Sequence, residues 1–282
     1  MKGARREFAT ADGLTLVGDV DGPHDAPLVL LLHGGGQTRH SWAGAMRALV
    51  SAGYRVVNLD ARGHGESEWS ADRAYSIHDR IKDIHAVVDG VSGPFALVGA
   101  SMGGLNAIHA VGEGLAPAAL ILVDIVPDME PEGVARIVGF MDAHHAGFAS
   151  LDEAADAVAA NYPERPRPKD PSGLMKNLRR RADGRLYWHW DPVMFGVEDP
   201  SEFRDPLERS TEKLGQRPEL PVLVVRGKLS DIVSDKSIAA FRRKVPHAEA
   251  ADVSEAGHMV AGDKNDAFNA AVIDFLKRHM PT

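Results

Sequence analysis

The chain has 282 residues, of which 44% are hydrophobic and 26% are charged, a composition typical of a folded globular protein rather than a disordered or fibrous one. Its 32 basic and 40 acidic residues give a net charge of -8, which argues against nucleic acid or an anionic membrane as the main partner. The absence of cysteine excludes disulfides and thiolate metal sites and favours a reducing compartment.

The start of the chain, MKGARREFATADG, carries basic residues, but no apolar signal core follows it. The longest apolar runs, such as LVLLL at residues 28–32, are too short to cross a bilayer. We therefore expect a cytoplasmic protein that does not bind membranes. The length suits one α/β domain with an insertion, and the oligomeric state is left open, with a homodimer as one option.

Short runs rich in leucine or β-branched residues recur along the chain, and each ends in glycine or a polar turn. They are LTLVGDV, PLVLLLHGGG, RVVNLDARGHG, FALVGASMGG, ALILVDIVP, PVLVVRGKLSD and AEAADVSEAGH. Those after the first lack polar alternation, which is typical of strands buried on both faces of a mostly parallel sheet.

Between these runs lie segments with apolar residues three and four positions apart, which predicts helices. The predicted helices span residues 42–52, 76–91, 102–112, 236–244 and 265–279. The alternating order of strands and helices predicts a doubly wound α/β fold.

Residues 127–217 interrupt this order and contain no convincing strand. They hold three helical patterns, a proline-rich patch and an aromatic stretch: VARIVGFMDAHH, LDEAADAVAANY, LMKNLRRR, YPERPRPKDP and RLYWHWDPVMF. We predict a mostly helical insertion here, with residues 1–126 and 218–282 forming the α/β core.

Ser101 stands between two glycines in GASMG, directly after a strand run and before a predicted helix. A sharp turn of this kind exposes a serine hydroxyl at the end of a sheet, which makes Ser101 the candidate nucleophile. Because a serine hydroxyl is a weak nucleophile at neutral pH, it needs a base and an acid that holds the base in place.

Downstream strand ends supply both groups. Asp231 follows the run PVLVVRG and His258 follows AEAADVSEAG, and functional groups in open α/β sheets gather at the carboxyl ends of the strands. We predict His258 as the base and Asp231 as the acid. Asp124, at the end of LILVD, also follows a strand and is the alternative acid.

An oxyanion that forms during attack on a carbonyl needs hydrogen-bond donors. The glycine-rich turn after His33, in HGGG, leaves backbone N–H groups uncovered. We predict that the backbone N–H groups of Gly35 and Met102 are the donors, and that His33 shapes the turn through hydrogen bonds.

Taken together, these motifs resemble those of α/β-hydrolase fold enzymes with a helical cap inserted after strand 6. The motifs are HGGG, DARGHGES, GASMGG, SDIV and AGHMV, and the resemblance covers residues 8–126 and 218–279. It implies the chain order Ser101, Asp231, His258 for the triad, a chemistry without metal or organic cofactor, and a substrate pocket roofed by the cap. The serine argues against dehalogenases and epoxide hydrolases, which carry an aspartate there.

Within that family the motifs are similar to those of carboxylesterases, enol-lactonases and carbon–carbon bond hydrolases. We expect a serine hydrolase that cleaves a carboxylic ester or lactone through an acyl-serine intermediate. Two alternatives stay open: a carbon–carbon bond hydrolase acting on a vinylogous diketone, and a ligand-binding or signalling protein with little turnover.

The aromatic stretch of the insertion supplies candidate substrate-binding residues. Trp188, Trp190 and Met194 would suit a small hydrophobic or aromatic ester or lactone. The same side chains could instead pack the insertion onto the core.

Overall fold

The computed structural model describes residues 3–161, 167–196, 200–254, 256–258, 260 and 265–282. Parts of the sequence motifs lie outside these described residues: residues 1–2 at the start of the chain, residues 162–166 of the proline-rich patch, Glu255 of AEAADVSEAGH and Met259 of AGHMV.

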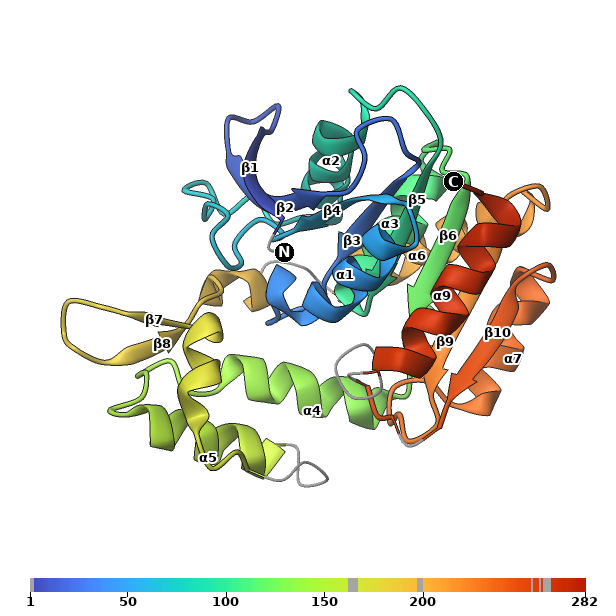
Figure 1. Cartoon of the computed structure of the whole chain (residues 1–282). Helices are drawn as coiled ribbons and strands as arrows, with labels where there is room; N and C mark the ends of the chain where they lie inside the picture. Colours follow the sequence, from blue (N-terminus) through green and yellow to red (C-terminus); the bar gives the residue numbers. More distant parts are fainter. Residues whose placement is uncertain (1–2, 162–166, 197–199, 255, 259, 261–264) are drawn as a thin grey trace.

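An eight-stranded sheet forms the centre of the molecule, in the order β1-β2-β4-β3-β5-β6-β9-β10 (Figure 1). β1 pairs antiparallel with β2 and β2 antiparallel with β4, whereas every other pair is parallel. The strands are β1 (Ala4–Ala9), β2 (Thr15–Asp21), β3 (Leu28–Leu32), β4 (Arg55–Leu59), β5 (Phe95–Ala100), β6 (Ala119–Val123), β9 (Val222–Gly227) and β10 (Glu249–Val253).

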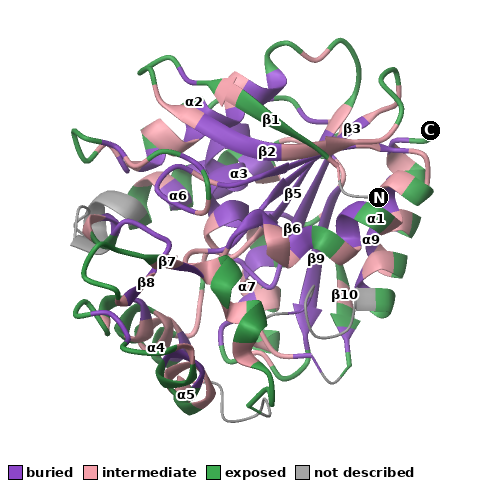
Figure 2. Ribbon diagram, turned by 60° about the vertical axis from the view of Figure 1, so that its left-hand side comes forward, coloured by how far each residue is buried: buried purple, intermediate pink, exposed green. Residues whose placement is uncertain are grey.

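The central strands are apolar on both faces, as their uninterrupted runs predict. In β3, Leu30 packs into the hydrophobic cluster on one side of the sheet, while Val29 and Leu31 pack into the cluster on the other side. Side chains alternate across a strand, so a run without polar residues requires helices on both faces. Figure 2 shows β5, β6 and β9 as buried strands in the middle of the molecule.

Helices cover the two faces of the sheet, which confirms the doubly wound α/β fold. One face carries α2 (Ile77–Val88), α3 (Met102–Gly112), α6 (Pro200–Gly215) and α7 (Asp235–Lys244). The other carries α1 (Ala43–Ser51), preceded by the 3-10 helix η1 (Arg39–Trp42), and α9 (Asn265–His279). The bounds of α3 and α9 are those predicted from the sequence. None of the helices among the described residues is long and apolar enough to cross a membrane.

The edge strand β1 was not among the predicted runs. Half of its sequence, ARREFA, is charged and most of it is exposed, so it lacks the apolar run that indicates a buried strand. Charged side chains on an edge strand discourage pairing with a second chain. The strand is therefore set by its pairing with β2 rather than by hydrophobic burial.

The segment between β6 and β9, here called the insertion (residues 127–217), begins beyond the carboxyl end of the parallel strands (Figure 1). Its last helix, α6, returns to the sheet and packs along α3. The extent of the insertion as a separate unit stays a prediction. It holds α4 (Pro131–Asp142), α5 (Leu151–Asn161), η2 (Pro171–Asn177), β7 (Leu178–Arg180), β8 (Leu186–Trp188), η3 (Pro192–Gly196) and α6.

One helical prediction within the insertion is wrong. LMKNLRRR forms the 3-10 helix η2 and then β7, which pairs antiparallel with β8. The turn of this hairpin contains Asp183 and Gly184, and Gly184 has a φ of 80°. An Asp-Gly pair between two short extended segments is a strong hairpin signal, and it outweighs the helical spacing of the residues before it.

Candidate active site

Ser101 occupies a strained turn between β5 and α3, with φ 47° and ψ -119°. A positive φ is unfavourable for a residue with a side chain, and the turn is tolerated because two neighbouring glycines allow close packing. A Cβ on Gly99 would lie 2.5 Å from the carbonyl oxygen of Gly103, and a Cβ on Gly103 would lie 2.3 Å from that of Leu32. The glycines of GASMG are thus required by backbone contacts, and they hold Ser101 at the carboxyl end of the sheet.

His258 is hydrogen-bonded to Asp124, the alternative acid of the sequence analysis. The distance from His258 Nδ1 to Asp124 Oδ2 is 2.7 Å. Asp124 follows β6 directly and is completely buried. Its Oδ1 accepts the backbone N–H of Gly227 at 3.0 Å, and its Oδ2 also accepts the hydroxyl of Ser230. Because the carboxylate accepts from Nδ1, Nε2 of His258 is left as the proton acceptor.

The predicted pairing of Asp231 with His258 is not found in the structure. The Asp231 carboxylate is 45% exposed and accepts from the Arg136 guanidinium, with Nε and Nη2 at 3.0 and 2.7 Å. The turn after β9 directs Ser230, not Asp231, toward Asp124. Asp231 instead joins the core to α4 of the insertion, which carries Arg136. We therefore correct the expected partner of His258 to Asp124.

Gly35 and Met102 have backbone N–H groups with no protein acceptor among the described residues. Met102 is the first residue of α3, where N–H groups have no intrahelical acceptor and the helix dipole favours negative charge. By contrast, the N–H of Gly34 is already used, because it donates to Gln37 Oε1 at 3.3 Å. A Cβ on Gly34 would lie 3.2 Å from the Cβ of Ser101, so the glycine turn lies against the serine.

His33 holds the peptide group that carries the N–H of Gly35. Its Nε2 accepts the N–H of Ala61 at 3.0 Å, so its Nδ1 carries the proton and donates to the carbonyl of Gly34 at 2.8 Å. In a trans peptide the C=O and the following N–H point in opposite directions. His33 therefore turns the N–H of Gly35 away from itself, and burial lowers the pKa of His33 and keeps the ring neutral.

A cavity of about 670 Å³ opens beside these groups, a volume within the range of small-molecule sites. Ser101 and His258 are on its wall, together with Gly35 and Met102. Trp188, Trp190 and Met194 line it as well, as the sequence suggested for substrate-binding residues. The two indole rings are stacked, with centroids 4.9 Å apart and an interplanar angle of 10°.

α4 also forms part of this wall, although none of its residues was predicted to bind substrate. Five α4 residues line the cavity: Val134, Ile137, Val138, Phe140 and Met141. Without Phe140, the other four are spaced by three, one and three positions, which is one face of a helix. This spacing in VARIVGFM is the sequence signal from which an apolar α4 face could have been predicted. The polar part of the lining contains Arg80, Asn106 and Lys176, and no aspartate or glutamate of the described chain belongs to it.

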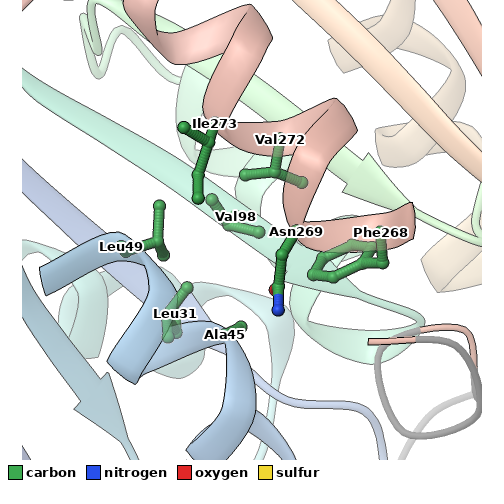
Figure 3. A pocket seen from close by; sticks show the side chains of 8 residues that line it. All are labelled: Leu31, Ala45, Leu49, Val98, Phe268, Asn269, Val272 and Ile273. Atoms are coloured by element: carbon green, nitrogen blue, oxygen red, sulfur yellow. The ribbon is translucent and has the colours of Figure 1, made fainter. Parts of the chain in front are cut away.

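A second gap lies between α1 and α9, among Leu31, Leu49, Val98, Phe268 and Ile273 (Figure 3). The space between these apolar side chains is too small for a water molecule. It is part of the packing of two helices on the sheet and has no catalytic group. Among the described residues, no group of three or more histidines and carboxylates is placed to hold a metal ion.

Comparison with known proteins gives the relatives of this chain in sequence and in structure. The family model of the alpha/beta hydrolase fold matches residues 27–264. An esterase of Mycobacterium tuberculosis is 30% identical over 250 residues, which are 85% of this chain and 79% of that protein. Its solved structure has a TM-score of 0.73 at 25% identity, covering 100% of this chain and 93% of that one.

Two further proteins are similar to this chain, one over about half of its length and the other in its fold. Protein phosphatase methylesterase 1 of Bos taurus is 34% identical over 139 residues, which are 47% of this chain and 37% of that protein. The solved structure of an E-2-(acetamidomethylene)succinate hydrolase has a TM-score of 0.83, covering 97% of this chain and 99% of that one. Its sequence identity is 22%, so this likeness concerns the fold alone.

Proposed function

The chain belongs to the α/β-hydrolase fold family and is a carboxylic ester hydrolase, and we propose that it works through an acyl intermediate on Ser101. In the first half-reaction, Nε2 of His258 takes the Ser101 proton as Oγ attacks the ester carbonyl. Asp124 stabilises the imidazolium that results, through Nδ1. The alkoxide leaving group then departs with the proton from His258, and the acyl group stays on Oγ.

In the second half-reaction, water attacks the acyl carbonyl while His258 again takes the proton. The tetrahedral intermediate collapses, Ser101 recovers its proton, and the carboxylic acid leaves. In both steps the N–H groups of Gly35 and Met102 stabilise the negative charge on the carbonyl oxygen, which is where such donors lower a barrier most effectively.

The observation that carries this proposal is the buried hydrogen bond between His258 and Asp124, beside a cavity that Ser101 also lines. A buried carboxylate of this kind holds a histidine in one tautomer and stabilises its protonated form, which is what a general base needs. Two open N–H groups near Ser101 supply the remaining part of the chemistry.

The apolar wall supports a small ester with a hydrophobic or aromatic part as the substrate. The stacked Trp188 and Trp190 and the α4 side chains would cover such a group, since apolar area drives binding in pockets of this kind. The relatives described above, an esterase and a methylesterase, support ester cleavage. A lactone requires the same steps and is included in the proposed substrate class.

The test compares the wild type with Ser101→Ala on 4-nitrophenyl esters of short and medium acyl chains. We expect nitrophenol release and fluorophosphonate labelling in the wild type, and loss of both in the variant with its circular dichroism unchanged. Acyl transfer from Ser101 to added hydroxylamine would report the covalent intermediate. Full turnover by Ser101→Ala would overturn the proposal, and faster cleavage of a vinylogous diketone than of any ester would replace the substrate class.

A further inference from the structure

In the sequence of the insertion, His189 stands between Trp188 and Trp190. Its side chain reaches the glycine turn of the core. It is 2% exposed. Its Nδ1 accepts the N–H of Gly65 at 2.8 Å, so its Nε2 carries the proton and donates to the carbonyl of Gly36 at 3.2 Å. One imidazole thus connects the insertion to two separate core loops.

His64 holds Gly36 through its other backbone group. The N–H of Gly36 donates to His64 Nε2 at 3.1 Å, and His64 Nδ1 donates to the carbonyl of Arg62 at 3.1 Å. Gly36 has a φ of 69°, and a Cβ there would lie 3.3 Å from Trp190. The turn therefore needs a glycine at this position, and its backbone is held from both sides.

His33, His64 and His189, the histidine trio, together hold three successive peptide groups. The peptide group before Gly35 is bonded to His33, the one after Gly35 to His64, and the one after Gly36 to His189. The rings of His33 and His64 are 5.0 Å apart, and those of His64 and His189 are 5.7 Å apart. Gly35, the proposed oxyanion donor, belongs to this set of three peptide groups, which we call the clamp on the glycine turn.

We propose that His189 is a positioning residue by which the insertion sets the oxyanion turn. This inference rests on the proposed function, because it assumes that the N–H of Gly35 stabilises the transition state. The backbone of His189 continues directly into Trp188 and Trp190, which line the cavity. The hydrogen bond of His189 therefore joins the wall that lines the cavity to the turn that carries the proposed oxyanion donor.

The insertion is attached to the core by other bonds that do not involve the His189 ring. The N–H of Asp191 donates to the carbonyl of Gly63 at 2.9 Å. The hydroxyl of Tyr75 donates to the Asp191 carboxylate at 2.6 Å, and the Trp69 indole donates to the carbonyl of His189 at 3.3 Å. Removing the imidazole should leave the wall docked. The peptide group after Gly36 would lose the hydrogen bond to its carbonyl, while its N–H, on Gln37, would still donate to the carbonyl of Gly34 at 3.1 Å.

Two amide variants separate the two hydrogen bonds of His189. In His189→Gln, the longer side chain can still donate to Gly36 from the position of Nε2. In His189→Asn, the shorter side chain can still accept from Gly65 at the position of Nδ1 but cannot reach Gly36. We expect kcat on a 4-nitrophenyl ester to fall about 10- to 100-fold in His189→Asn, less than or equal to the loss of a whole oxyanion donor, with KM within about twofold.

His189→Gln should recover most of that loss. A trifluoromethyl ketone, whose hemiketal oxyanion would occupy the same donors, should bind more weakly to His189→Asn in proportion to the fall in kcat/KM. Tyr75→Phe is the matched control, because it removes a bond between insertion and core without touching the glycine turn. It should lower the melting temperature and raise KM while kcat stays within about threefold.

Equal kcat in His189→Asn and the wild type would overturn the inference, as would an equal loss in Tyr75→Phe. If His189→Asn does not fold, the affinities of His189→Gln and Tyr75→Phe for the trifluoromethyl ketone are compared instead. The inference fails if His189→Gln binds the ketone more weakly than Tyr75→Phe does. Ester turnover that is lost in Ser101→Ala but unchanged in His189→Asn would contradict this inference and leave the proposed function intact. Turnover that survives Ser101→Ala would sink the proposed function itself.

Discussion

Asp124 Oδ2 lies 2.7 Å from Nδ1 of His258, and this contact joins the end of β6 to the loop that follows β10. The two strands are not neighbours, because β9 lies between them in the sheet. β9 nevertheless takes part in the contact, since Gly227 and Ser230 both donate to the Asp124 carboxylate. The acid is thus satisfied by three donors and is completely buried.

The choice of acid predicts opposite results for two matched substitutions. Asp124→Asn should lower kcat by about 10³- to 10⁴-fold, because an amide in that place favours the wrong histidine tautomer. Asp231→Asn should keep kcat within about threefold, since it removes only a partly exposed ion pair, which contributes about 0–1 kcal/mol. The measurement is kcat on a 4-nitrophenyl ester, with folding checked by circular dichroism. Inactivation by Asp231→Asn alone would restore Asp231 as the acid.

Acid should destabilise the protein through the histidine trio. Burial lowers the pKa of His189 to about 3 and holds the pKa values of His64 and His33 below their usual range. Between about pH 3 and pH 6.5 the unfolded chain therefore binds more protons than the folded one, so the free energy of unfolding falls as pH falls. The charged groups that act on the trio are Asp60, Arg39, Arg80 and Arg179.

Above about pH 6.5 the histidine trio carries no such cost, because the rings are neutral in the folded and the unfolded chain. Below it, each histidine lowers the free energy of unfolding by up to about 1.4 kcal/mol per pH unit. Urea unfolding at pH 7, 6 and 5 would measure this slope. His189→Gln should reduce the slope by nearly one proton, because glutamine does not titrate. His24→Gln is the control, since His24 is highly exposed and its loss should leave the slope almost unchanged. Equal slopes in the wild type and His189→Gln would contradict the buried neutral ring.

Met141 should set the size of the group accepted beside the glycine turn. It lines the cavity, and a Cβ on Gly35 would lie 3.5 Å from its terminal methyl group. Met141→Ala enlarges this space, and we expect kcat/KM for bulky acyl esters to rise about 10-fold relative to acetate. The loss of packing should lower the free energy of unfolding by about 2 kcal/mol or more.

A series of 4-nitrophenyl esters of graded acyl length checks this change in selectivity. Met175→Ala is the matched control, because Met175 is 42% exposed and is not on the cavity wall. Its selectivity should equal that of the wild type. If both variants shift equally, or neither does, Met141 does not define the acyl space.

Features that depend on near neighbours in the chain could be predicted from the amino-acid sequence. The strands β3, β5, β6 and β9 follow from apolar runs, and the turn at Ser101 follows from its flanking glycines. These features are local, because strands buried on both faces are mostly apolar and the turn leaves no room for a Cβ at Gly99 or Gly103. The same reasoning placed His258 at a strand end and Gly35 in an open turn.

Only the tertiary structure decided which carboxylate meets His258. Asp124 and Asp231 both follow strands, β6 and β9, which are neighbours in the sheet, so both lie at the same edge and position alone cannot separate them. The decision depends on which way each side chain points, and the turn after β9 presents Ser230 while Asp231 turns to Arg136. The clamp on the glycine turn has the same origin, since its three histidines are brought together only by folding.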